Sequence, residues 1–202
     1  GLILPPRIDP LQVVIVPIYK GEDQKPKLDA KANEMMKDLK AAGISVKYDD
    51  NDNNRPGWKF AEYELKGVPV RVALGARDLE NGLVEIARRD TKEKQNVSVE
   101  NTVAHIQQLL IDIQQNLFNR ALSYRDEHTT KVDTWDDFIS VLDGKGGFVS
   151  AHWDGTAETE EQIKEKTKAT IRCIPLNNEQ EEGKCILTGK PSAQRVLFAR
   201  AY

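Results

Sequence analysis

The feature that most constrains the fold is the change of pattern at Lys66-Gly67. Before it, residues 56–66 open with Pro-Gly and continue with the spacing of a short helix. After it, Val68 to Leu74 is a β-branched, apolar run that leads into a turn at Gly75. Glycine ends helices and β-branched residues favour strands. The stretch therefore predicts a helix, a tight break and a buried strand, which is a unit of an α/β fold.

This stretch, Pro56 to Glu80, also carries side chains suited to binding nucleic acid. They fall near two neighbouring element ends and are Lys59, Phe60, Glu64, Arg71, Arg77 and Asp78. An exposed aromatic ring stacks on a base, a carboxylate accepts from base amino groups, and a guanidinium contacts guanine or phosphate. The set suits single-stranded RNA. The same pattern is also compatible with an ordinary helix-to-strand connection that has solvated charges at its ends.

The rest of the first half predicts a five-stranded sheet flanked by helices. A helical pattern at Leu28 to Ala42 stops at Gly43, and a long amphipathic helix is expected from Val99 to about Glu127. The expected strands are Leu11 to Ile18, Ile44 to Tyr48, Val68 to Leu74, Leu83 to Arg88 and Lys94 to Ser98.

A second, small α+β unit is expected from Thr129. Asp133-Thr134 resembles a helix N-cap before Trp135, and this helix should end at Gly144. Strands are expected at 148–152 and 170–174, with a helix around 160–167 between them. Two more strands should follow a loop at 177–183.

Composition limits the class of protein and of partner. The 202 residues are 39% hydrophobic, which is enough for one large or two small domains. The formal net charge of −3 argues against wholesale binding to a polyanion, so any RNA contact must be local. Two cysteines make no disulfide scaffold, and no apolar run approaches the roughly 18 residues of a membrane helix. With no signal peptide visible, we expect a cytoplasmic protein without a membrane partner.

Three segments resemble one enzyme family. Residues 56–80 resemble the anticodon-binding signature of prolyl-tRNA synthetase, in the archaeal and eukaryotic-like branch of this class II enzyme. Residues 1–10 resemble the end of the family's catalytic domain, and residues 194–202 resemble its C-terminus with the terminal Tyr202. The resemblance implies a catalytic-domain tail at 1–10, an anticodon-binding domain at 11–128 and a zinc-binding-like domain at 129–202.

The resemblance also implies a function. The family's full-length homodimer attaches L-proline to tRNA(Pro) through a prolyl-adenylate, using ATP and magnesium. The catalytic motifs do not occur in this chain, so we expect it to need no cofactor and to be inactive alone.

The resemblance further implies the roles of single residues at the two guanines of the proline anticodon. It assigns stacking to Phe60, guanine edges to Glu64 and Arg77, and support to Lys59, Arg71 and Asp78. It also implies that the Tyr202 carboxylate reaches toward the catalytic domain.

The C-terminal unit departs from the family's zinc pattern. Many relatives bind zinc through four cysteines, spaced C-x4-C after a Trp and C-x2-C before Gly-Lys. The corresponding positions here are Asp154, Thr159, Cys185 and Thr188. One thiolate, one carboxylate and two hydroxyls make a poor zinc site.

We therefore expect folding without zinc, supported by a hydrogen-bonded cluster of Asp154, Thr159 and Thr188. Cys173, on a predicted strand, is expected in the core. The apolar packing expected around the cluster involves Trp153, Ile163, Ile171, Ile174 and Leu197.

Two alternatives remain from the sequence. Threonyl-, histidyl- and glycyl-tRNA synthetases have a related anticodon domain, although the added C-terminal unit argues against them. Alternatively, the chain is a freestanding module that binds a small molecule or a protein at the carboxyl edge of its sheet.

Overall fold

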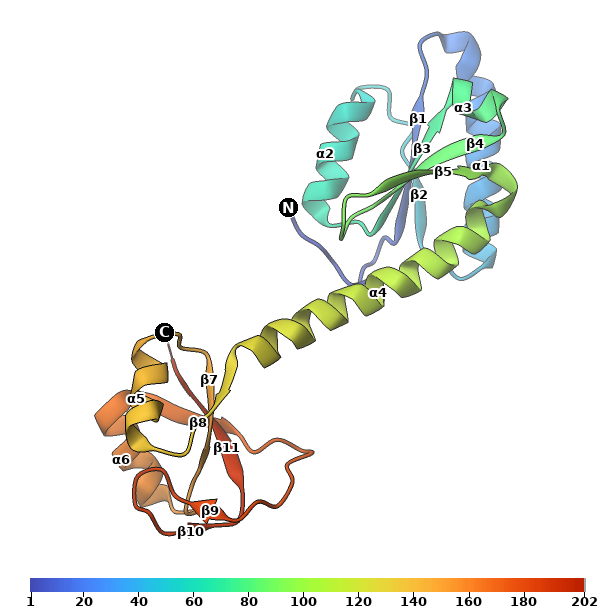
Figure 1. Ribbon diagram of the computed structural model, residues 1–202. Helices are drawn as coiled ribbons and strands as arrows, with labels where there is room; N and C mark the ends of the chain where they lie inside the picture. The colour runs from blue at the N-terminus through green and yellow to red at the C-terminus, as the bar shows by residue number, and fades with distance from the viewer. Residues whose placement is uncertain (202) are drawn as a thin grey trace. The chain divides into compact units, whose positions relative to one another are not determined.

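The chain forms two compact units. The computed structural model describes residues 1–201, so the expectation for Tyr202 lies outside the described residues. One unit comprises Gly1–Arg120, and the other begins at Ala121 (Figure 1). The boundary between them falls within α4 (Thr102–Glu127). No helix of the described part has the length and apolar character needed to cross a bilayer.

The first unit contains the expected mixed five-stranded sheet, in the order β2-β1-β3-β4-β5. Its first three strands are parallel and the last two pairings are antiparallel. Parallel neighbours require crossover connections, and α1 and α2 supply them. The strands are β1 (Val13–Ile18), β2 (Val46–Tyr48), β3 (Val70–Gly75), β4 (Leu83–Arg88) and β5 (Lys94–Ser98).

Helices cover both faces of this sheet. Successive strand residues point to opposite faces, so Val13 and Ile15 of β1 enter one core while Val14 and Val16 enter another. The larger core includes residues of α1 and α4, and the smaller one contains Tyr63 of α2. The helices are α1 (Lys25–Ala41), α2 (Pro56–Lys66), α3 (Ala76–Glu80) and α4, with 3-10 turns at Glu22–Gln24 and Val99–Asn101.

The second unit is a small α+β fold, as expected. Its four-stranded sheet has the order β6-β7-β11-β8 and a separate ribbon pairs β9 with β10. The Thr134 side chain caps α5 by accepting from the Asp137 amide. The elements are β6 (Thr129–Lys131), α5 (Trp135–Asp143), β7 (Phe148–His152), α6 (Ala157–Thr167), β8 (Ala169–Cys173), β9 (Gly183–Lys184), β10 (Pro191–Ser192) and β11 (Arg195–Arg200).

Two details of this unit differ from expectation. Strand β6 was not expected, because its three residues are too short to show an alternating pattern. Three strands, rather than two, follow the loop at 177–183, since two of them are only two residues long.

The loop at 177–183 is held to the second sheet by Arg195. This buried side chain donates from Nε to Glu181 (3.0 Å) and from Nη1 to the carbonyl of Val132 (2.9 Å). Lys131 also donates to Glu181 at 3.0 Å. Hydrogen bonds from Arg195 and then Lys131 lower the pKa of Glu181 to about 2. The acidic loop is therefore an ion-paired part of the fold.

This pairing predicts a pH dependence. Because the pKa of Glu181 is depressed by folding, its stabilisation is present above about pH 4.5 and is lost as the pH falls toward 2. At pH 6, the melting temperature of the chain should be higher than that of a Glu181→Gln variant. This difference in melting temperature should vanish near pH 2. A difference that stays constant across this range would show that Glu181 is not ion-paired. Glu182→Gln, next to it in the loop, is the control.

The glycine break after α2 is more tightly enclosed than the one after α1. Gly67 has φ +86°, and an added Cβ would lie 2.8 Å from Leu2 Cβ. Gly43, after α1, has φ +78° with open space around it. Gly43→Ala should cost about 1–2 kcal/mol for the left-handed backbone alone. Gly67→Ala should cost more, because a clash adds to the same strain. Urea unfolding measures the free energy of unfolding of both variants. Equal losses in the two variants would contradict the close contact between Gly67 and Leu2.

Candidate nucleic-acid interface

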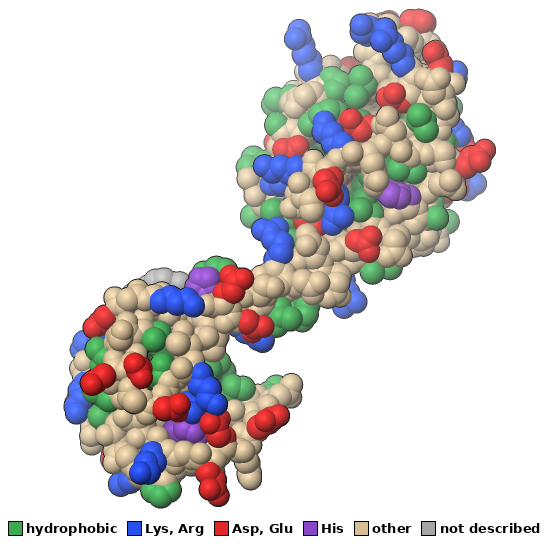
Figure 2. Space-filling view, in the orientation of Figure 1, with side chains coloured by type: hydrophobic (Ala, Val, Ile, Leu, Met, Phe, Trp, Pro, Cys, Tyr) green, Lys and Arg blue, Asp and Glu red, His purple; other side chains and the backbone are tan. Residues whose placement is uncertain are grey.

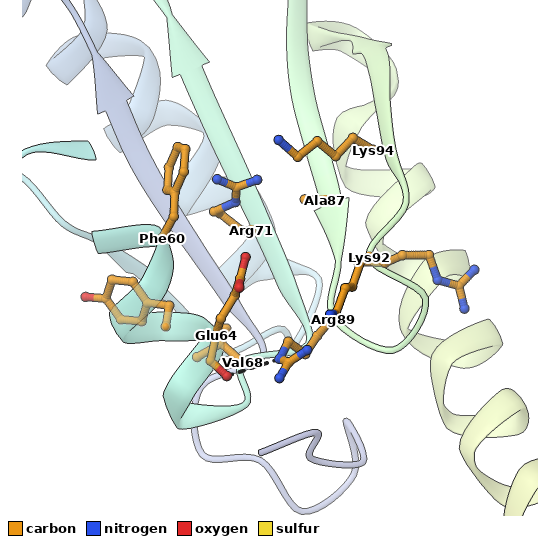
Figure 3. A pocket seen from close by; sticks show the side chains of 10 residues that line it. Phe60, Glu64, Val68, Arg71, Ala87, Arg89, Lys92 and Lys94 are labelled. Atoms are coloured by element: carbon orange, nitrogen blue, oxygen red, sulfur yellow. Dashed lines mark hydrogen bonds between the residues drawn. The ribbon is translucent and has the colours of Figure 1, made fainter. Parts of the chain in front are cut away.

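A cavity lies between α2, the start of β3 and the β4–β5 hairpin (Figure 3). It lies at the amino end of β3, not at the carboxyl edge expected for a freestanding ligand-binding module. Helix α2 packs against the sheet on one side of the cavity, and the hairpin pairs with β3 on the other side. Its lining comprises Phe60, Tyr63, Glu64, Val68, Arg71, Ala87, Arg88, Arg89, Lys92 and Lys94.

Arg71 is the most constrained side chain of this cavity. It is 7% exposed, and its guanidinium carbon lies 3.5 Å from the centre of the Phe60 ring. Its Nη2 donates to Glu85 at 3.4 Å, whereas its buried Nη1 has no partner among the described residues. Burial lowers the pKa of Arg71, and the carboxylates of Glu85 and Glu64 oppose this effect. A buried N–H without an acceptor is costly, so Nη1 is suited to a ligand's acceptor.

Glu64 supplies the acidic group of the cavity. It is exposed in the last turn of α2, and Figure 3 shows its carboxylate directed into the space beside Arg71. Its backbone carbonyl accepts from Nε of Arg89 at 3.1 Å. Helix α2 and the hairpin are therefore directly connected at the rim of the cavity.

The hairpin is also fixed from the opposite side. Asp90 accepts from Arg88 Nε (2.7 Å) and Nη2 (2.6 Å), and from Asn116 of α4 (2.6 Å). Burial alone raises the pKa of Asp90, but these hydrogen bonds outweigh it and lower the pKa. The turn that carries Lys92 is thus held to α4, and its basic side chains are presented on a fixed backbone.

Sequence reasoning missed the basic hairpin residues Arg88, Arg89, Lys92 and Lys94. The available signal was a run of charged residues between two strands, but such turns are usually only solvated. Basic side chains on the visible face of the first unit are interspersed with acidic ones (Figure 2). This agrees with the expectation that any RNA contact is local.

Three of the six sequence-derived residues do not line the cavity. Lys59 is 3% exposed and donates to the Asp49 carbonyl at 2.7 Å, so its ammonium is held against the preceding loop. Arg77 and Asp78 lie on α3, beyond the opposite end of β3. Phe60, Glu64 and Arg71 are brought together, as the sequence suggested. Phe60 is only half-exposed, because Arg71 covers one face of its ring.

Three of the four degenerate zinc positions, Asp154, Thr159 and Thr188, form the expected hydrogen-bonded cluster. Asp154 Oδ2 accepts from the hydroxyls of Thr159 and Thr188, both at 2.9 Å, and Oδ1 accepts from Thr156 at 3.0 Å. Burial on its own raises the pKa of Asp154, but the hydroxyl hydrogen bonds reverse the effect and lower the pKa. In residues 1–201, no group of three or more His, Cys, Asp or Glu side chains is arranged to hold a metal ion.

The surroundings of this cluster correct two expectations. Cys173 is exposed at the end of β8 rather than in the core, and Ile174 is 46% exposed. Both come where the strand ends and leaves the sheet, which its apolar residues did not reveal. Cys185 is buried. Ile163 belongs to the core, with Trp153 and Ile171 packed against it.

Comparisons with known proteins agree with this architecture. The family described as "Anticodon binding domain" matches residues 12–109. The family described as "Prolyl-tRNA synthetase, C-terminal" matches residues 135–202. Proteins named "Proline--tRNA ligase" are similar over the whole chain: 61% identical in Porphyromonas gingivalis, 60% in Phocaeicola vulgatus and 57% in Flavobacterium johnsoniae. The chain spans 41% of the length of each of these relatives.

The fold of the first unit and its family match define an anticodon-binding domain. Together with the C-terminal match and the identity along all 202 residues, they show that the chain belongs to the prolyl-tRNA synthetase family. The resemblance to the prolyl-tRNA synthetase family is thereby confirmed, whereas the archaeal and eukaryotic-like branch stays a prediction. The alternatives of another synthetase family and of a freestanding module are not supported.

The hydroxyl cluster predicts stability without metal. Asp154→Ala removes the acceptor of three threonine hydroxyls and should cost about 1–3 kcal/mol in urea unfolding. Glu161→Ala, which removes an exposed charge from α6, should stay within about 0.5 kcal/mol. EDTA should leave the melting temperature unchanged. Stoichiometric zinc on elemental analysis, or a large fall in melting temperature with EDTA, would contradict this account.

Proposed function

We propose that this chain recognises the anticodon of proline tRNA through the cavity between α2, β3 and the β4–β5 hairpin. The observation that carries the proposal is the convergence of an aromatic ring, a carboxylate and several cations in an anticodon-binding domain. Single-stranded loops are recognised by stacking and by hydrogen bonds to exposed base edges. The cavity offers both kinds of contact.

The chemistry of the cavity suits guanine, which occurs twice in a proline anticodon. Guanine presents N–H donors on its Watson–Crick edge and the acceptors O6 and N7. The Glu64 carboxylate can accept from the donors, while Arg71 and Lys94 can donate to the acceptors. Phe60 supplies a stacking face opposite the one that Arg71 covers. Adenine lacks this combination, and its amino group would face a cation.

The basic hairpin serves the RNA backbone in this proposal. Arg89 and Lys92 lie at the rim of the cavity, next to Arg71 and Lys94. Lysine and arginine contacts to phosphate position a nucleic acid without reading its sequence. Arg77 and Asp78 stay proposed contributors from α3, whereas Lys59 acts only by holding the loop before α2.

For the whole protein, we propose the ligation of proline to tRNA(Pro) through a prolyl-adenylate. The catalytic domain, the sites for ATP and magnesium, and the homodimer contacts are assigned to the part of the relatives that this chain does not span. Among the residues that the structure describes, no three His, Cys, Asp or Glu side chains are grouped to hold a metal ion. Tyr202 is proposed to extend toward that catalytic domain, and the protein is proposed to be cytoplasmic.

The proposal is tested by binding of this chain to an anticodon stem-loop of proline tRNA. Glu64→Ala should weaken binding about 5- to 150-fold, because one good base contact is worth about 1–3 kcal/mol. Isothermal titration calorimetry or fluorescence anisotropy measures the effect.

The matched control is Glu62→Ala, which removes the same charge from the same helix at a residue paired with Lys66 outside the cavity. This variant should bind as the unaltered chain does. A chain that binds the loop equally well when both guanines are replaced by adenines would overturn the proposal.

A further inference from the structure

Glu85 of β4 links two cations of the cavity without lining it. Its Oε1 lies 3.4 Å from Nη2 of Arg71 and 3.8 Å from Nζ of Lys94. Arg71 comes from β3 and Lys94 from β5, the strands on either side of β4. Arg71 pairs with Ala87 and Glu85 pairs with Ala73, so the carboxylate reaches Arg71 diagonally across the sheet. The antiparallel register therefore places one carboxylate between two cavity cations.

The contact with Glu85 determines how Arg71 is oriented. The Phe60 ring restricts the plane of the guanidinium, and Glu85 restricts its rotation within that plane by accepting from Nη2. The remaining terminal nitrogen, Nη1, is buried and has no partner in the described part of the chain. Without Glu85, the guanidinium could rotate within that plane and present a different N–H edge to the cavity.

We propose that Glu85 is a positioning residue for base recognition: it holds Arg71 so that the N–H groups of Nη1 remain for the acceptor edge of guanine. It also neutralises part of the positive charge shared by Arg71 and Lys94. This inference rests on the proposed function of the cavity. It adds a residue that acts through Arg71 and that does not itself touch RNA.

Glu85 should affect specificity and overall affinity in opposite directions. Removing its charge makes the cavity more positive, and added positive charge strengthens sequence-independent binding to RNA. Removing its hydrogen bond frees Arg71, which weakens the guanine contact. A residue that only stabilised the fold would lower the affinity for every RNA alike.

The experiment compares the chain with Glu85→Gln in binding to two anticodon stem-loops, one with the two guanines and one with adenines in their place. We expect the ratio of the two affinities to fall about tenfold, because a weakened charged hydrogen bond costs about 1.4 kcal/mol. The affinity for the adenine loop should stay equal or rise, most clearly at low salt.

Two further variants separate charge from geometry. Glu85→Asp keeps the charge but has a shorter side chain. Its affinity for the adenine loop should equal that of the unaltered chain, while its preference for guanine should be partly lost. Glu93→Gln removes the same charge from the same hairpin at an exposed residue that contacts Thr91, and its guanine preference should be unchanged.

An unchanged preference in Glu85→Gln would overturn the inference while leaving the proposed function intact. Equal losses for both loops, together with a lower melting temperature, would also overturn it, because Glu85 would then have a structural role. If the unaltered chain itself shows no preference for guanine, the proposed function fails, and the inference fails with it.

Discussion

The structure of the first unit depends on how it accommodates a buried guanidinium. Residues of β3 alternate between two covered faces, so Val70, Val72 and Leu74 enter the larger core while Arg71 is directed to the side of α2. A buried charge needs partners. Phe60 provides a ring face and Glu85 a carboxylate, but these leave one nitrogen unsatisfied. The cavity lies beside this nitrogen, and a ligand can supply the missing acceptor.

The hairpin beside Arg71 is hydrogen-bonded to two helices. Arg89 contacts the last turn of α2, and Asp90 accepts from Asn116 on α4. Both contacts involve groups that are held by helices. Binding groups placed on a fixed backbone lose less conformational entropy when a ligand arrives. The same helices that cover the sheet therefore also set the geometry of the candidate interface.

Much of the fold was predictable because local signals agreed with the tertiary structure. The helix, glycine break and strand at 56–75 and the Thr134 cap follow from residue chemistry that acts over a few positions. The burial of Lys59 was not predictable, because it depends on Asp49 being carried back beside it by the intervening loop. The roles of Glu85 and the basic hairpin depend on strand register, which a single sequence does not specify.

The central claim is that guanine contacts the cavity beside Arg71, and a nuclear magnetic resonance titration tests it most directly. Backbone and arginine side-chain signals would be followed while an anticodon stem-loop of proline tRNA is added. The account predicts the largest shifts at Phe60, Glu64, Arg71 and Lys94, including a newly hydrogen-bonded Nη signal of Arg71. Shifts confined to α3 and the carboxyl ends of β1 and β3, with the Arg71 side chain unaffected, would contradict it.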